Sequence, residues 1–153
     1  MYSIVKPIVR ITRAASGDDL RKAFAIRMRV FVREQGVPAE IELDDDDRHA
    51  IHLLAFAAGK SVGTARVVLR RGGAKIGRMA VLKSYRGKGV GTKLLQNAIE
   101  AAKRKRARRI YLHAQVAVIG FYETAGFRAV GPLFKEAGIP HRKMTWTKRS
   151  PAR

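Results

Sequence analysis

Residues 81–92 read VLKSYRGKGVGT and join an apolar, strand-like run to an amphipathic, helix-like one. Gly87, Gly89 and Gly91 would let backbone N–H groups approach an anion without intervening side chains, and Arg86 and Lys88 add positive charge. The start of a helix adds unpaired N–H donors and the positive end of its dipole. The stretch therefore predicts a site for a phosphorylated ligand between a strand and a helix.

Two common nucleotide-binding patterns do not fit this loop. The Walker loop needs a glycine, four residues and then Gly-Lys-Ser/Thr, and the chain has no such string. The dinucleotide pattern Gly-x-Gly-x-x-Gly fails because Thr92 or Leu94 stands at its last position. An Arg-x-x-Gly-x-Gly pattern does fit, over Arg86, Gly89 and Gly91. The pattern alone leaves a second interpretation open, a glycine-rich turn that merely caps a surface helix.

Hydrophobic periodicity predicts a mixed α and β chain. The expected strands are 9–12, 51–58, 62–70, 75–82, 109–114, 127–130 and 142–147, and the expected helices are 18–35, 89–105 and 117–125. The three central strands form an antiparallel meander in the simplest arrangement. The strand after the long helix would run parallel to the strand before the glycine loop, which creates a seam in an otherwise antiparallel sheet.

The first helix and the segment that follows it differ sharply in composition. Leu20, Phe24, Met28 and Phe31 fall at spacings of four and three, which predicts one stripe facing a core. Residues 39–48 are acidic and include four consecutive aspartates at 44–47, so we expect a loop that forms a solvated acidic rim. This run lacks the glycine and distal glutamate of a calcium loop, and no metal site is predicted.

Composition sets broad limits on function. The 153 residues suit a single domain, with a basic tail from about residue 148. The chain has no cysteine, which excludes an acyl-cysteine intermediate. The longest apolar run, residues 53–59, is too short for a membrane helix, and no sorting signal stands out, so we expect a cytoplasmic protein without a membrane partner. The net charge of +20 favours contact with polyanions at low salt.

A second motif makes the pattern more specific. Residues 121–127 read FYETAGF, and they follow the strand after the glycine loop. Together the two motifs resemble the GCN5-related N-acetyltransferases (GNAT), whose acyl-CoA pyrophosphate loop has the Arg-x-x-Gly-x-Gly pattern. Residues 30–38, 42–44 and 136–141 resemble the ElaA-like branch of that family. The resemblance implies a mixed, mostly antiparallel, twisted sheet of six to seven strands flanked by about four helices, with acyl-CoA at the parallel seam.

The resemblance also implies direct transfer of an acetyl group from acetyl-CoA to an amine. The implied cofactor-binding residues are Met79, Ala80, Val81, Arg86, Gly87, Lys88, Gly89, Val90, Gly91, Thr92 and Gln115. Tyr122 resembles the family's general acid, which protonates the departing thiolate. Gln115 stands where most of the superfamily has asparagine, and a polar strand end is the alternative to a contact with the CoA arm. A half-buried structural tyrosine is the alternative for Tyr122.

An amine acceptor must lose a proton, so a general base is needed. The candidates are Glu34, Glu42, His52 and His113, of which we select Glu34 and His113. Each has a structural alternative, because a carboxylate at a helix end is often solvated and a strand histidine is often a core residue. An acidic rim would attract a cationic acceptor, which favours a polyamine, an aminoglycoside or a lysine side chain.

Two other functions stay open on the sequence alone. The cations at 103–109 and 148–153 fit a nucleic-acid-binding module, although no helix-turn-helix, zinc-finger or RNP-like signature accompanies them. The second open function is that of a CoA-binding protein that has lost its catalytic activity. Homodimerisation is also open, because the late strands could pair within one chain or exchange between two.

Overall fold

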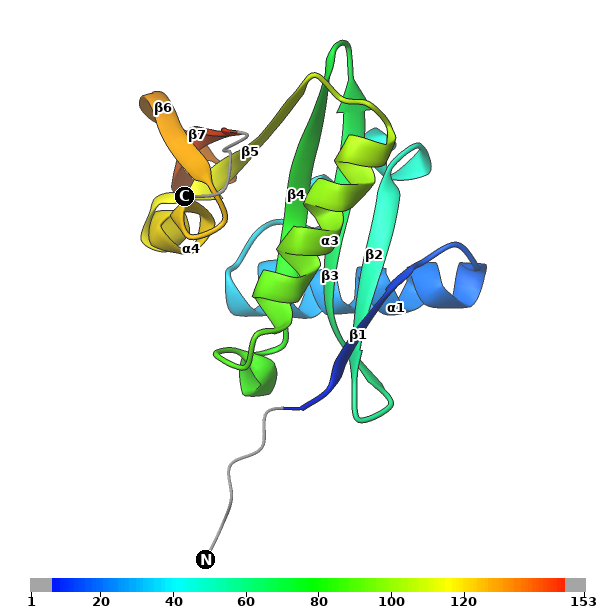
Figure 1. The fold of residues 1–153 in the computed structure, drawn as a ribbon. Coiled ribbons are helices and arrows are strands. Elements are labelled where there is room, and N and C mark those ends of the chain that lie inside the picture. Colours follow the sequence, from blue (N-terminus) through cyan, green and yellow to red (C-terminus); the bar gives the residue numbers. More distant parts are fainter. Residues whose placement is uncertain (1–6, 148–153) are drawn as a thin grey trace, which may run out of the picture.

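A seven-stranded mixed sheet forms the centre of the computed structural model, which describes residues 7–147 (Figure 1). The strands are β1 (Val9–Arg13), β2 (Ile51–Ala57), β3 (Lys60–Arg70), β4 (Gly73–Val81), β5 (Arg109–Gln115), β6 (Phe127–Glu136) and β7 (Ile139–Trp146). They lie in the order β1-β2-β3-β4-β5-β7-β6, and only β4 and β5 are parallel. The predicted α+β class, the antiparallel meander and the single parallel pair are therefore confirmed.

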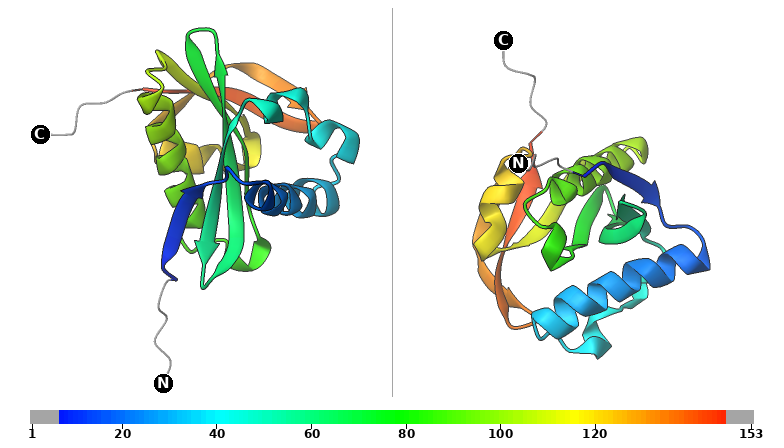
Figure 2. Two further views of the ribbon diagram at one scale, coloured as in Figure 1. Left: turned by 90° about the vertical axis from the view of Figure 1, so that its right-hand side faces the viewer. Right: turned by 90° about the horizontal axis from the view of Figure 1, so that it is seen from below.

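Four α-helices flank the sheet: α1 (Gly17–Arg27), α2 (Ala39–Glu42), α3 (Val90–Arg104) and α4 (Ile119–Glu123). The other helical segments are the π-helix η1 (Met28–Glu34) and three short 3₁₀ turns, η2 (Asp45–Arg48), η3 (Lys83–Tyr85) and η4 (Val116–Val118). Helix α3 covers one face of the sheet and α1 covers the other, as the view from below shows (Figure 2). The sheet thus has two cores, one under each helix.

The larger core lies between α3 and the sheet, where the predicted helical spacing is realised. Val90, Leu94, Leu95 and Ala98 are buried on α3 against strand residues such as Leu112. Each fully buried aliphatic side chain contributes on the order of 2 kcal/mol of burial free energy. Helix α3 is therefore held rigidly on the sheet, and its N-terminus is fixed relative to β4.

The predicted helix over 18–35 is confirmed in extent, but its second half is a π-helix and not an α-helix. Ser16 caps α1 by accepting a hydrogen bond from the Asp19 N–H at 3.1 Å, but the α-helix ends at Arg27 and continues as the π-helix η1. The wider turn of a π-helix changes which side chains face the sheet. Ala23 and Ile26 of α1 and Val30 of η1 are buried against the sheet, and the predicted stripe from Leu20 to Phe31 is only partly buried.

The late strands are longer than the sequence predicts. The expected strands 127–130 and 142–147 are parts of β6 and β7, which form a hairpin through Ala137 and Gly138. Both residues adopt positive φ, at 53° and 77°, as a tight hairpin turn requires. The hairpin pairs within the same chain and attaches to β5 through β7. It therefore places residues 136–141 beside the end of β5.

The parallel strands β4 and β5 separate partway along their length (Figure 1). They pair only from Gly73 to Ile76 of β4. Beyond that point β5 keeps β7 on its other edge and β4 keeps β3 on its other edge. A bulge marks this point, because β4 has one extra residue opposite β3 and Arg78 has a φ of 49°. The backbone of β4 beyond Ile76 is thus left without a neighbour on the β5 side.

No helix within the described part of the chain is long and apolar enough to cross a membrane. The predicted basic tail from about residue 148 lies outside the described residues.

Candidate active site

The glycine loop has the geometry of an anion site. Gly87 and Gly89 have φ values of 74° and 86°, a region that strains residues with a side chain, and Gly89 caps the N-terminus of α3. Within residues 7–147, the N–H groups of Gly87, Lys88 and Gly89 donate no hydrogen bond to the rest of the protein. Unpaired donors and the positive end of a 15-residue helix therefore converge at one point.

Gly91 connects this loop to the second motif. A Cβ atom placed on Gly91 would lie 3.3 Å from the Phe121 ring carbon Cζ. The absence of a side chain thus lets α4 pack closely against the first turn of α3. Because Tyr122 follows Phe121 in α4, this contact fixes the position of the phenol relative to the glycine loop.

Arg86 and Glu34 lie together, although they were expected to have separate roles, in cofactor binding and in proton transfer. The Arg86 guanidinium donates from Nη1 to Glu34 Oε2 at 2.6 Å and from Nη2 to Oε1 at 2.8 Å. Its Nε also donates to the Val81 carbonyl at 2.9 Å. The hydrogen bonds and charge of Arg86 hold the pKa of Glu34 below its usual value. The pair joins the end of η1 to the glycine loop.

A cavity of about 580 Å³ opens where β4 and β5 separate. The predicted site residues that line it are Met79, Ala80, Val81, Arg86, His113, Gln115 and Tyr122. Gln115 donates from Nε2 to Gln35 Oε1 at 3.0 Å, so its amide is held across the cavity by the end of η1. The exposed edge of β4, the glutamine and the phenol therefore surround one space.

Tyr122 sits in an aromatic cluster at this cavity. Its ring packs edge-on against Phe121 and Phe127, at centroid distances of 5.0 and 6.2 Å. Burial raises the pKa of Tyr122 to about 12. The hydroxyl is therefore protonated at neutral pH, which is the state that a proton donor requires.

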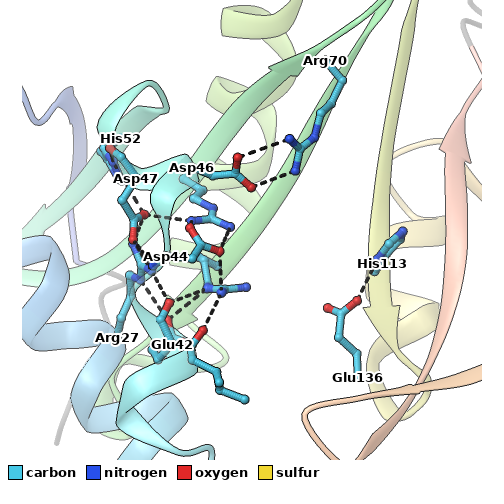
Figure 3. A network of polar contacts seen from close by, with 12 residues as sticks. Arg27, Glu42, Asp44, Asp46, Asp47, His52, Arg70, His113 and Glu136 are labelled. Atoms are coloured by element: carbon cyan, nitrogen blue, oxygen red, sulfur yellow. Dashed lines mark hydrogen bonds and ion pairs between the residues drawn. The ribbon is translucent and has the colours of Figure 1, made fainter.

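His113 forms a pair that the sequence did not indicate. Its Nδ1 lies 2.9 Å from Glu136 Oε1 at the end of β6, as Figure 3 shows. The hydrogen bond from His113 lowers the pKa of Glu136 to about 2, so the carboxylate is ionised and Nδ1 carries the proton. Phe134 packs edge-on against the imidazole at 5.0 Å. The Nε2 atom has no hydrogen-bond partner in the described structure and is available as a base.

The predicted solvated acidic rim is wrong. The segment forms α2 and η2, and four of its six carboxylates, those of Glu42, Asp44, Asp46 and Asp47, bind arginines (Figure 3). Arg27 is only 1% exposed and donates from Nε to Glu42 Oε2 at 2.9 Å and from Nη1 to Asp47 Oδ1 at 2.7 Å. Arg66 donates to Asp44 and Asp47 at 2.7 and 2.8 Å. We call this set the arginine–carboxylate cluster.

Two more arginines complete the arginine–carboxylate cluster. Arg78 donates to Asp44 Oδ2 at 3.1 Å, and Arg70 donates to Asp46 Oδ2 at 2.7 Å. His52 joins through Nε2, 3.0 Å from the Asp47 carbonyl, and burial lowers its pKa. The two other base candidates of the sequence, Glu42 and His52, are therefore parts of this cluster. Its role is to attach α2 and η2 to α1 and the sheet.

Two motifs, the strand order and the seam together define the class of protein. Residues 16–148 match the acetyltransferase (GNAT) domain family, and the chain belongs to this family. Among its relatives is the uncharacterised N-acetyltransferase YjcF of Bacillus subtilis, which is 37% identical over 132 residues, or 86% of this chain and 94% of the relative. The resemblance to the ElaA-like branch is also confirmed, because Escherichia coli ElaA is 32% identical over 76% of this chain and 79% of ElaA.

Solved structures agree with this assignment. The crystal structure of E. coli ElaA superposes with a TM-score of 0.82 at 27% identity, over 92% of this chain and all of ElaA. A GNAT family acetyltransferase from Elizabethkingia anophelis, crystallised with acetyl-CoA bound, has a TM-score of 0.68 at 18% identity. That match covers 90% of this chain and 94% of the other, and it supports the fold alone.

Proposed function

We propose that this protein is an N-acetyltransferase that moves the acetyl group of acetyl-CoA directly to a primary amine. The observation that carries the proposal is the continuity of the site. An unpaired strand edge, two proton-handling side chains and Arg86 line one cavity, and Arg86 leads directly into the loop with unpaired N–H groups. Membership of the acetyltransferase (GNAT) family supports acetyl-CoA as the acyl donor.

The glycine loop and β4 would each bind a different part of acetyl-CoA. Backbone N–H groups from Arg86 to Thr92 would hold the pyrophosphate at the start of α3. The free edge at Met79, Ala80 and Val81 would pair with the amides of the pantetheine arm as an added strand does. A backbone N–H at this edge would also stabilise charge on the thioester oxygen. Gln115 lies on the opposite wall and would contact the arm there.

His113 and Tyr122 fit complementary proton transfers. Nε2 of His113 would take a proton from the acceptor amine, while Glu136 holds the imidazole in that tautomer through Nδ1. The amine nitrogen then bonds to the acetyl carbon, the carbon–sulfur bond breaks, and the phenol of Tyr122 donates its proton to the thiolate. Because both Glu34 oxygens bind Arg86, we assign Glu34 to holding Arg86, and His113 is the base that we favour.

The test combines binding with turnover. Acetyl-CoA at millimolar concentration should raise the melting temperature, and amine acceptors should release free thiol from it. Gly89→Val should remove the thermal shift, since its side chain strains a φ of 86° at the centre of the loop. Gly36→Val is the matched control, because Gly36 also has positive φ but lies outside the cavity and the loop. An unchanged melting temperature with acetyl-CoA on the unsubstituted protein would reject the proposal.

A further inference from the structure

The formal charges that line the cavity balance, but the ion pairs among them leave one cationic side chain without a partner in the described part of the chain. Four carboxylates and four cationic side chains contribute to its wall, namely Glu42, Asp44, Asp46 and Glu136, and Arg66, Lys75, Arg78 and Arg86. Each of the four carboxylates is already bound to an arginine or to His113. Each of the three arginines is bound to a carboxylate as well. In the described part of the chain, Lys75 is the lining cation without a hydrogen bond or ion pair.

Lys75 faces the same space as the proposed base. In β4 it lies between the buried residues Ala74 and Ile76, which point toward α3, so its own side chain points to the opposite face. Its neighbour across the parallel ladder is Tyr111, two residues before His113. Alternation along β5 thus puts His113 and Lys75 on one face of the sheet, and both line the cavity.

The charged groups around Lys75 favour the binding of an anion beside it. Burial lowers its pKa, and the positive charges of Arg66, Arg70 and Arg78 act in the same direction. The Glu136 carboxylate opposes them, but it lies outside ion-pair distance and is already bound to His113. A partly buried ammonium with three guanidinium groups around it is stabilised when a negative group of a ligand approaches.

We infer that the acceptor is an amine that also carries a carboxylate, which Lys75 binds while the amine lies against His113. This inference rests on the proposed function and narrows its substrate class. The cationic acceptors that an acidic rim would attract lose their support, because the carboxylates of that segment are bound to arginines.

The spacing along β4 suggests which amino acids fit. Lys75 precedes Met79 by four residues, or about 13 Å of extended strand, shortened by the bulge at Arg78. The lysine side chain covers part of that distance. An amine at the free edge of β4 and a carboxylate at Lys75 would therefore be separated by a chain of several atoms, as in an ω-amino acid, and not by the single carbon of an α-amino acid.

Calorimetry on the protein saturated with CoA tests the inference without turnover. The probes are 4-aminobutyrate and 6-aminohexanoate, each paired with the alkylamine of equal chain length. We expect each carboxylate to bind about 10-fold or more tightly than its partner, the effect of one charged hydrogen bond. Lys75→Met should abolish the difference, and Lys75→Arg should retain part of it. Lys60→Met, at an exposed position outside the cavity, loses the same charge and should retain the full difference.

The outcomes separate the inference from the proposed function. Equal affinities within each pair, absence of measurable binding by both carboxylates, or a preference that survives Lys75→Met would overturn the carboxylate site. Failure of CoA itself to bind would reject the proposed function. If CoA does not bind, the same calorimetric titrations are made on the protein without CoA. The three results named above would again overturn the carboxylate site at Lys75.

Discussion

Replacing Arg27 with methionine should destabilise the fold more than any surface change. The guanidinium is almost fully buried and makes four hydrogen bonds, two to Glu42 and two to Asp47. Methionine retains most of the apolar stem but none of the donors, so the Arg27→Met variant loses polar contacts with little loss of packing. The Glu42 carboxylate would then remain buried with one fewer partner.

The expected loss in the free energy of unfolding depends on the charges that remain when Arg27 is replaced. Removing one member of a buried ion pair costs about 3–5 kcal/mol, mainly because the other charge is left uncompensated. In this protein Arg78 still lies 3.2 Å from Glu42, and Arg66 still lies 2.8 Å from Asp47. These residual cations place the loss at the lower end, about 3 kcal/mol. That is a large share of the roughly 5–15 kcal/mol that stabilises a typical domain.

Urea unfolding monitored by circular dichroism measures this loss. With a slope of roughly 2–3 kcal/mol per molar for a chain of this size, the midpoint should fall by about 1–1.5 M. Arg29→Met, at an exposed position of the adjoining η1, should change stability by less than about 0.5 kcal/mol. Adding Glu42→Gln to Arg27→Met should recover part of the loss, because burial already raises the pKa of Glu42. A loss below about 1 kcal/mol for Arg27→Met would refute the reasoning.

Three further outcomes test the site and the cluster. Tyr122→Phe should keep acetyl-CoA affinity and lower kcat about 100-fold in a thiol-release assay, whereas full turnover would exclude a role as acid. Burial alone would raise the pKa of Asp47, but hydrogen bonds and charge from Arg27 and other donors lower it to about 2 from 3.8. Its contribution of about 2 kcal/mol is thus complete above pH 4 and lost as pH falls through 2, and Asp47→Asn should flatten acid unfolding over that window. Gly91→Leu should displace the Phe121 ring and lower kcat/KM while the far-ultraviolet spectrum stays unchanged.

Local chemistry explains why the glycine loop and the strand order were predictable. A glycine-rich turn, an amphipathic helix with apolar residues from Val90 to Ala102 and the next strand lie consecutively in the sequence. Each of these features is set by neighbouring residues, so periodicity and turn chemistry suffice to find them. The seam then follows from handedness and connection length, since a strand, a helix and a second strand form a parallel pair.

Long-range pairing explains what the sequence did not reveal. Asp44 and Asp46 were interpreted as solvated because their partners, Arg66 and Arg70, lie 22 and 24 residues away. Glu136 was missed for the same reason, since His113 precedes it by 23 residues on another strand. The only local signal for Glu136 was its place in a segment that resembles the ElaA-like branch. Charged residues find partners through topology, which composition does not encode.

The contact between Gly91 and Phe121 limits how these positions can change in descendants of this chain. An alanine at 91 would require the ring to move by a few tenths of an ångström, and a larger residue would require a smaller one at 121. The two positions are 30 residues apart in sequence, in different motifs. Substitutions at positions 91 and 121 should therefore arise as compensating pairs. In a library that randomises both codons, glycine at 91 together with an aromatic residue at 121 should be selected far more often than independent selection at each position would give.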